Sequence, residues 1–243
     1  MTYARNGSRL LIIALSALLG AAVVAPALPA AAAPEPPFEI RFPQETEATV
    51  FSSSFGAPRS GGRRHTGNDL MAPKMTQVYA AADGVISVVA TSSLAGRYIE
   101  IDHCDGWSTR YIHLNNDDPG TDNGSADWDR TVVPDLVEGS HVTAGQHVAW
   151  VGDSGNAEGA GSHTHFEIAY EGQEIDPYPI LKSAYLRDRF RQLVDLWHVS
   201  GLPSRGDQAQ LSALASSSAT TSATTSGCDD ETTADSLVPV GGA

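Results

Sequence analysis

The sequence predicts an all-β domain with an antiparallel sheet core, followed by one amphipathic helix and a disordered tail. Short segments rich in β-branched and aromatic residues recur between residues 77 and 170, and Gly, Asp, Asn and Pro separate them. No helical periodicity competes with this pattern before Pro179. The three-residue connection at 104–106 indicates that the strands on either side of it run antiparallel.

The elements follow in order along the chain. Residues 34–43 are Pro-rich with an alternating apolar centre, which indicates an entry arm (34–47) with one short strand. We expect the domain to span 48–182. Its strands are predicted at 48–53, 77–80, 84–91, 97–103, 107–114, 147–152 and 164–170. An acidic insertion at 115–138 shows no strand pattern before Val132.

The segment after the predicted sheet reads as a helix. Apolar residues recur at helical spacing from Ile180 to Trp197, and we assign the C-terminal helix to 183–200, with a stop signal at Gly201 to Pro203. Residues 201–243 are rich in Ser, Thr and Ala, a composition typical of a disordered, low-complexity tail.

The first 33 residues have the pattern of an export signal. Two arginines precede the apolar run 10–24, and small residues continue to Ala33. An uncleaved membrane anchor is the alternative, but the apolar core is short for a span of about 20 residues. We therefore expect a protein that is secreted to the cell exterior or the cell wall and has no membrane contact after cleavage. Export also permits a disulfide between Cys104 and Cys228, a hypothesis that the sequence leaves open.

The charge balance excludes one class of partner. Lys and Arg number 15 against 29 Asp and Glu, which gives a net charge of −14. A chain so acidic lacks the basic surface that attracts phosphate backbones, so we expect no nucleic-acid partner. No pattern for self-association stands out, and we expect a monomer.

Three histidine-containing segments have the character of a metal site. His65 and Asp69 lie four residues apart in a Gly-containing stretch that leads from a turn into a strand. His163 and His165 are two residues apart on a predicted strand, so both imidazoles can face the same side of the sheet. Tyr111 and His113 are expected to share a strand face for the same reason. Taken singly, each segment is more often structural than functional.

Together these segments resemble the LytM or lysostaphin type of zinc metallopeptidase, peptidase family M23. The resemblance covers about residues 50–177, and its motifs stand in the family's order. They are His65-x-x-x-Asp69, Ala72-Pro73, the run 78–86, Tyr111-Ile112-His113-Leu114, 142–146, 151–157 and the run His163-Thr164-His165-Phe166-Glu167-Ile168.

The resemblance implies a sheet core of the LytM/lysostaphin type and a zinc ion held by His65, Asp69 and His165. It implies that His113 and His163 stay off the metal as catalytic bases or oxyanion partners, with roles that could be exchanged. Two imidazoles and one carboxylate would leave a fourth position for water, as in catalytic zinc sites. The substrate-binding residues are unknown at this stage.

The implied function is a secreted zinc endopeptidase that hydrolyses peptide bonds in bacterial peptidoglycan, in crosslinks or bridges. The alternative is a non-catalytic LytM-type module that binds the cell wall or activates another hydrolase. The insertion 115–138 departs from the family's text and would lie beside the cleft, which it could narrow. Its acids could hold calcium, although a solvated acidic loop is the commoner meaning of such a run (Asp117, Asp118, Asp122, Asp127, Asp129).

Overall fold

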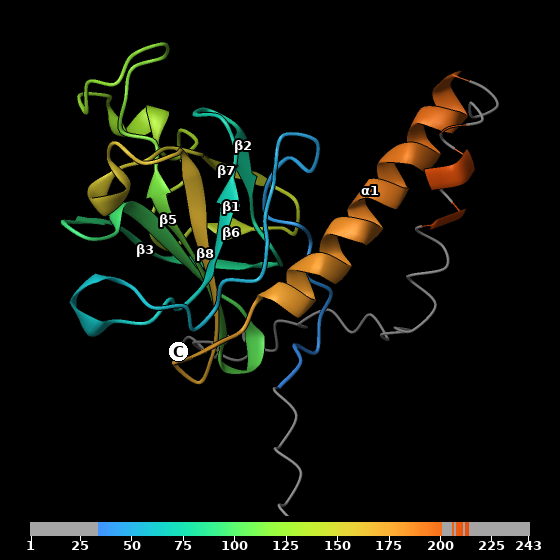
Figure 1. Ribbon diagram of the computed structural model, residues 1–243, viewed down its shortest axis with the longest axis horizontal. Helices are drawn as coiled ribbons and strands as arrows, with labels where there is room; N and C mark the ends of the chain where they lie inside the picture. The colour runs from blue at the N-terminus through green and yellow to red at the C-terminus, as the bar shows by residue number, and fades with distance from the viewer. Residues whose placement is uncertain (1–33, 201–205, 207, 211, 214–243) are drawn as a thin grey trace, which may run out of the picture. The chain divides into compact units, whose positions relative to one another are not determined.

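Antiparallel strands form most of the regular structure in the computed structural model, which describes residues 34–200, 206, 208–210 and 212–213. One sheet has the strand order β1-β8-β5-β4-β3-β6, and β9 also pairs with β8 (Figure 1). Its strands are β1 (Asn68–Met71), β3 (Gly84–Ser92), β4 (Gly96–Asp102), β5 (Trp107–Leu114), β6 (His141–Val142), β8 (His163–Tyr170) and β9 (Gln173–Ile175). A second, two-stranded sheet pairs β2 (Gln77–Tyr79) with β7 (His147–Trp150).

The predicted fold class is confirmed. Every strand pair is antiparallel, and the connection between β4 and β5 is the short 3-10 turn η2 (Cys104–Gly106). The sequence pattern locates six strands within a few residues of their observed bounds, namely β2, β3, β4, β5, β7 and β8. It assigns no strand to β6 and β9, which have two and three residues, and it indicates β1 only as the strand into which the His65–Asp69 stretch leads.

Two predicted strands are wrong. Neither the entry arm nor residues 48–53 form a strand, and only isolated bridges occur there, between Gln44 and Val78 and between Val50 and Met71. The apolar residues of the arm are buried for another reason: Ile40 and Phe42 pack into the core, and Phe51 packs against it. Burial against side chains therefore produced the alternating pattern without a hydrogen-bonded ladder.

The expectation that Tyr111 and His113 share a strand face is also wrong. Tyr111 and Leu114 lie in the hydrophobic core, whereas Ile112 and His113 line the opposite pocket. His113 has a φ of 63°, and the pairing of β5 with β4 shifts register between Arg97 and Ile99. A bulge of this kind re-aims side chains at the end of a strand, and here it turns the imidazole of His113 out of the core.

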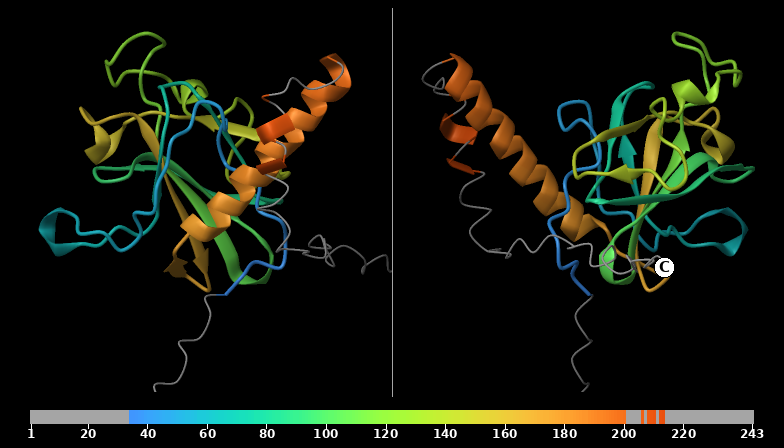
Figure 2. Two further views of the ribbon diagram at one scale, coloured as in Figure 1. Left: turned by 45° about the vertical axis from the view of Figure 1, so that its right-hand side comes forward. Right: turned by 180° about the vertical axis from the view of Figure 1, so that it is seen from behind.

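The long helix α1 (Tyr178–Ser200) packs against the arm and the core through its first turns. It begins earlier than the pattern indicates, because Asp176 caps the backbone N–H of Tyr178 at 3.0 Å and a proline is tolerated in a first helical turn. Asp188 accepts hydrogen bonds from Phe42 N (2.7 Å) and from Arg41 Nε (2.9 Å), which ties the helix to the arm. Figure 2 shows the start of α1 beside the arm, from two further sides.

Several expectations concern residues outside those that the structure describes. They are the export signal at 1–33, Cys228 as a partner of Cys104, and most of the tail. Where the tail is described, it is helical at 206, 208–210 and 212–213. Gln208, Ala209 and Gln210 favour helices, and Ser212 Oγ donates a hydrogen bond to Gln208 O at 2.9 Å. No helix among the described residues is long and apolar enough to cross a membrane.

Candidate metal centre

The antiparallel pairing of β1 with β8 brings the three predicted metal ligands together. Asp69 lies directly opposite His165 in the register, and His65 lies three residues before β1. Gly67 permits this approach, because a Cβ atom there would lie 2.3 Å from Phe166 O and 2.9 Å from His165 Nε2. The glycine inside the His65–Asp69 motif is therefore needed for close packing of the two ligand-bearing segments.

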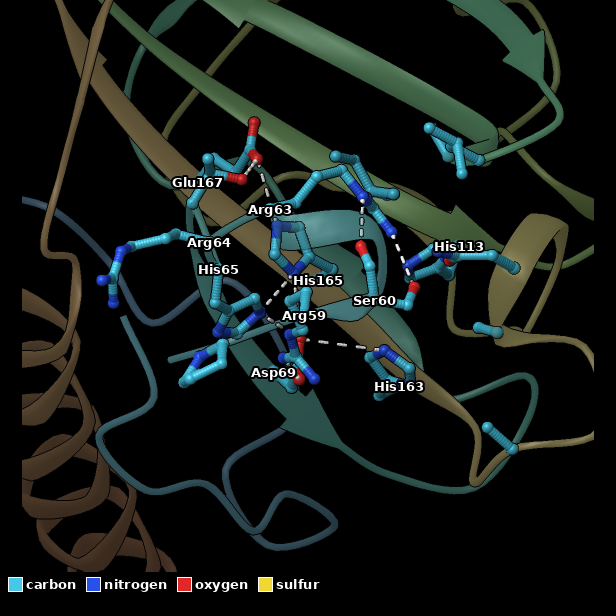
Figure 3. A pocket seen from close by; sticks show the side chains of 18 residues that line it. Arg59, Ser60, Arg63, Arg64, His65, Asp69, His113, His163, His165 and Glu167 are labelled. Atoms are coloured by element: carbon cyan, nitrogen blue, oxygen red, sulfur yellow. Dashed lines mark hydrogen bonds and ion pairs between the residues drawn. The ribbon is translucent and has the colours of Figure 1, made fainter. Parts of the chain in front are cut away.

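The three ligand atoms form a small triangle (Figure 3). His65 Nε2 lies 2.8 Å from His165 Nδ1, and each of these nitrogens lies 2.9 Å from Asp69 Oδ1. The residues His65 and His165 are buried, and Asp69, whose carboxylate lines the pocket, is half-buried. Three donor atoms this close can share one small cation.

The outer hydrogen bonds decide which atoms carry protons. His65 Nδ1 lies 2.9 Å from the carbonyl of Ser54, which can only accept, so this nitrogen donates and Nε2 keeps its lone pair. His165 Nε2 donates in the same way to Glu167 Oε1 at 3.1 Å, which leaves the lone pair on Nδ1. Both imidazoles can therefore turn a ring-nitrogen lone pair toward Asp69 Oδ1, and this donor set fits a metal cation.

Glu167 also lines the pocket. It belongs to the sequence motif 163–168, which gave it no role. Burial raises the pKa of its carboxyl, but hydrogen bonds from His165 and Thr66 and the charge of Arg110 outweigh burial and lower the pKa to about 2. Arg110 Nη1 holds the other oxygen at 2.9 Å. Because Glu167 follows His165 by two residues on β8, it faces the same pocket, and strand periodicity could have indicated it.

Asp69 uses its second oxygen for another contact. Oδ2 accepts a hydrogen bond from Arg59 Nη2 at 2.6 Å, while Oδ1 faces the two imidazoles. Burial raises the pKa of Asp69, but the hydrogen bonds and charges of His165 and His65 outweigh it and hold the pKa well below its usual range. The carboxylate is therefore ionised at neutral pH, as a metal ligand must be.

His113 and His163 lie beside this triangle as a second pair of imidazoles. Their ring centroids are 5.0 Å apart, and His163 Nε2 lies 3.8 Å from Asp69 Oδ1. His113 Nδ1 donates to Ser154 O (2.9 Å) and His163 Nδ1 donates to Gly161 O (2.7 Å). Both rings therefore present Nε2 to the pocket. Burial and the neighbouring charge of His163 lower the pKa of His113 to about 4, so His113 is neutral at physiological pH.

The four histidines and Asp69 line one cavity of about 560 Å³. One wall is a hairpin of residues 58–64 around the 3-10 turn η1 (Ser60–Gly62), which was not foreseen as part of the site. The other wall consists of small or apolar residues (Leu94, Ala95, Ala157, Ala160). Within the part of the chain that the structure describes, none of the lining residues comes from the arm or from the insertion. The expectation that the insertion narrows the cleft is therefore wrong.

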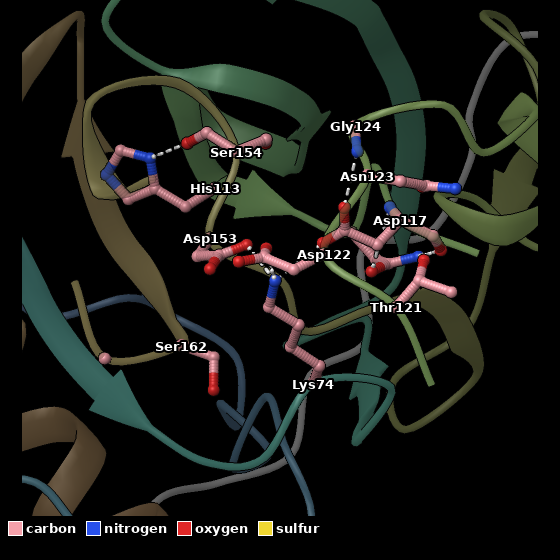
Figure 4. Close-up of polar contacts among 12 residues, drawn as sticks. Lys74, His113, Asp117, Thr121, Asp122, Asn123, Gly124, Asp153, Ser154 and Ser162 are labelled. Carbon is pink, nitrogen blue, oxygen red and sulfur yellow. Dashed lines mark hydrogen bonds and ion pairs between the residues drawn. The ribbon is translucent and has the colours of Figure 1, made fainter. Parts of the chain in front are cut away.

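The insertion is instead attached to the domain through Lys74, which does not line the cavity (Figure 4). Lys74 Nζ lies 2.7 Å from Asp117, 2.5 Å from Asp122 and 2.8 Å from Asp153. Burial lowers the pKa of Lys74, but hydrogen bonds to these three carboxylates outweigh it and raise the pKa above its usual range. The ammonium group of Lys74 therefore supplies, beside these carboxylates, the positive charge that a bound calcium ion would supply. Asp153 adjoins Ser154, whose carbonyl accepts the proton of His113.

Comparison with known proteins confirms the family resemblance. The family model described as Peptidase family M23 matches residues 63–124, which include His65, Asp69 and His113. The chain is 30% identical over 152 residues to a curated relative from Vibrio cholerae named peptidoglycan DD-endopeptidase ShyB. This match covers 59% of the chain and 31% of the relative. The matched part spans only 22% to 31% of the first curated relatives.

Solved structures of the same kind are also similar to the chain. A zinc-containing peptidase from Vibrio cholerae is 27% identical with a TM-score of 0.45, and the match covers 56% of this chain and 38% of that one. The catalytic domain of lysostaphin from Staphylococcus simulans is 25% identical with a TM-score of 0.44, covering 55% of this chain and 92% of that one.

Proposed function

The chain resembles peptidase family M23 over residues 63–124, which include the candidate ligands His65 and Asp69, and on this premise we propose that it is a zinc-dependent endopeptidase that hydrolyses peptide bonds of bacterial peptidoglycan. The observation that carries the proposal is the convergence of three donor atoms, from His65, Asp69 and His165, beside two further imidazoles in one cavity. The name of the curated relative supports the substrate class.

The three ligands would hold the metal with one position open to the pocket. A zinc ion bound there supplies Lewis acidity, which makes water more acidic and polarises a carbonyl group. Two neutral nitrogens and one carboxylate suit zinc better than calcium or magnesium, which prefer oxygen ligands. Glu167 and the Ser54 carbonyl orient the two imidazole ligands, an outer shell of the kind that catalytic metal sites use.

His113 and His163 are proposed to move protons. Each holds a proton on Nδ1 through a backbone carbonyl and presents the Nε2 lone pair to the cavity. A neutral imidazole can accept the proton of the attacking water at Nε2 and return it to the leaving amine. Once protonated, the same Nε2–H can donate to the oxygen of the tetrahedral species. We assign the proton of the water to His163, which lies nearer Asp69. His113 is assigned to the oxyanion, for which its Nε2 must first have accepted a proton, because an unprotonated Nε2 cannot donate, and the two roles can be exchanged.

The test is to incubate the zinc-loaded chain with purified peptidoglycan, with and without a chelator, and to identify the fragments by mass spectrometry. We expect new peptide ends that chelation abolishes and that the matched variant His163→Gln does not produce. Intact peptidoglycan after incubation with stoichiometrically loaded protein would contradict the proposal. That result would instead favour a wall-binding or hydrolase-activating module.

We further infer that the protein acts outside the cytoplasm, since its proposed substrate is the cell wall and residues 1–33 have the pattern of an export signal. Sequencing the N-terminus of protein recovered from the culture medium or wall fraction would test this. We expect a new N-terminus near residue 34, whereas an intact Met1 would exclude signal cleavage.

A further inference from the structure

The hairpin 58–64 places an arginine without an acidic partner at the edge of the metal pocket. Arg59, Arg63 and Arg64 all belong to the pocket wall, in a chain whose net charge is −14. Most other cations of the described domain are engaged by carboxylates, among them Lys74 and Arg110. A cluster of three guanidinium groups in an acidic chain therefore concentrates positive charge at one side of the site.

The hairpin has a defined position relative to the metal ligands. Arg59 N donates to Arg63 O at 2.9 Å, and His65 N donates to Ala57 O at 2.9 Å, so the two sides of the hairpin are paired. Gly61 and Gly62 have φ values of 71° and 76°, which the tight turn requires. The ion pair between Arg59 and Asp69 then links the hairpin to the metal centre itself.

The guanidinium of Arg63 makes few hydrogen bonds with the rest of the protein. Its contacts are Nε to Ser60 O at 3.3 Å and Nη2 to Ser60 Oγ at 3.5 Å, both long and both to neutral oxygens. Among the described residues, no carboxylate lies within ion-pair distance of Arg63. A guanidinium offers five donors in a planar fork that matches a carboxylate, so Arg63 has donors to spare for a ligand.

We propose that Arg63 binds a free carboxylate of the peptide substrate and so positions the scissile bond over the metal centre. The opposite wall, formed by Leu94, Ala95, Asn156, Ala157 and Ala160, carries no cation, so a carboxylate of the peptide is attracted to the hairpin side. This inference rests on the proposed function and deepens it, because it names the substrate class as peptides with a free carboxylate close to the scissile bond.

Two cations outside the pocket serve as controls. Arg130 and Lys182 are exposed, and neither lines the pocket. Arg130→Gln and Lys182→Gln therefore remove the same charge as Arg63→Gln without removing the proposed contact.

The experiment measures binding, which does not depend on turnover. A synthetic stem tetrapeptide is titrated calorimetrically into the zinc-loaded full chain in three forms. These are the free acid, the form amidated only at the C-terminal carboxylate, and the form amidated only at side-chain carboxylates. We expect one of the two amidated forms to bind about tenfold more weakly than the free acid, as the loss of a charge-assisted hydrogen-bonded pair predicts. The carboxylate that is amidated in that form is the one that Arg63 holds.

Arg63→Gln should weaken binding of the free acid by the same factor. It should not change binding of the amidated form that already binds the wild type more weakly. Arg63→Lys should restore only part of the preference, because an ammonium lacks the fork. The controls should bind like the wild type. Equal binding of all three forms, absence of binding by any form, or an unchanged preference in Arg63→Gln would overturn the inference. Carboxylate-dependent binding without peptidoglycan cleavage would contradict the proposed function alone.

Discussion

Nε2 of His65 and Nδ1 of His165 lie 2.8 Å apart, and a hydrogen bond from the opposite nitrogen of each ring allows both facing atoms to present a lone pair. Two lone pairs held this close, with an ionised carboxylate oxygen 2.9 Å from each, repel one another unless a cation lies between them.

Metal binding should depend on the outer hydrogen bonds as well as on the ligands. We expect His65→Ala, Asp69→Ala and His165→Ala each to abolish stoichiometric zinc binding, measured by competition with a chromogenic chelator. Glu167→Gln should lower zinc affinity by about 10- to 100-fold, because the amide cannot hold His165 Nε2–H as an anion does. Wild-type affinity in Glu167→Gln would contradict the role given to this carboxylate.

His113 and His163 should matter for turnover and not for metal content. We expect His113→Gln and His163→Gln to retain one zinc per chain while the rate of peptidoglycan cleavage falls by about 10²- to 10⁴-fold. Metal content is measured by elemental analysis and the rate by mass spectrometry of released peptides. Loss of zinc from His163→Gln would mean that this imidazole binds the metal directly.

The lowered pKa of His113 predicts a pH-dependent stability. Between pH 6.5 and about 4 the unfolded chain binds a proton at this imidazole that the folded chain does not bind. The contribution to the free energy of unfolding is therefore complete above pH 6.5 and is lost as the pH falls toward 4, by up to about 3 kcal/mol.

Denaturant unfolding in chelator at pH 7, 6 and 5 measures this loss. We expect His113→Gln to lose less stability than the wild type over this range, because glutamine does not titrate. His141→Gln, at an exposed position, should behave like the wild type. Identical pH slopes in the wild type and His113→Gln would show that the burial of His113 does not govern its protonation.

Lys74 should hold the acidic insertion onto the domain. Its ammonium is the shared partner of Asp117 and Asp153, whose side chains are only 2% and 5% exposed. Lys74→Met would leave buried carboxylates without a cation, and we expect a loss of about 3 kcal/mol in the free energy of unfolding. Asp122→Asn, at the exposed end of the cluster, is the matched control and should cost less than about 1 kcal/mol. Equal effects of the two changes would refute the assignment.

Gly67 should be indispensable for the approach of β1 to β8 at the ligands. In Gly67→Ala the new Cβ would lie 2.3 Å from the carbonyl oxygen of Phe166, so the strands must separate. We expect lower zinc affinity together with a loss of about 2 kcal/mol or more in stability, as overpacking of a closely packed site costs. Gly172→Ala, at a position where nothing lies within 4 Å of the new Cβ, is the control without a clash, and it should leave zinc affinity unchanged.

Most strands of the sheet and the residue types of the site could be predicted from local sequence patterns. Alternation with a period of two along 163–170 and 107–114 predicts strands, and it places His163 and His165 on one face because a strand's side chains alternate between its two sides. The ligand residue types also follow from the sequence, since their motifs carry the family resemblance. These features are local, and a local pattern suffices for them.

Only the tertiary structure decided the remaining features, because each depends on contacts between segments far apart in the chain. The tautomers follow from Ser54, Ser154, Gly161 and Glu167, and three of these four partners are carbonyl groups, which side-chain identity does not reveal. The bulge at His113 reverses the face that alternation predicts. The sequence predicted that the insertion would lie beside the cleft, but the hairpin 58–64 forms the wall there. Lys74 holds the insertion elsewhere through its carboxylates.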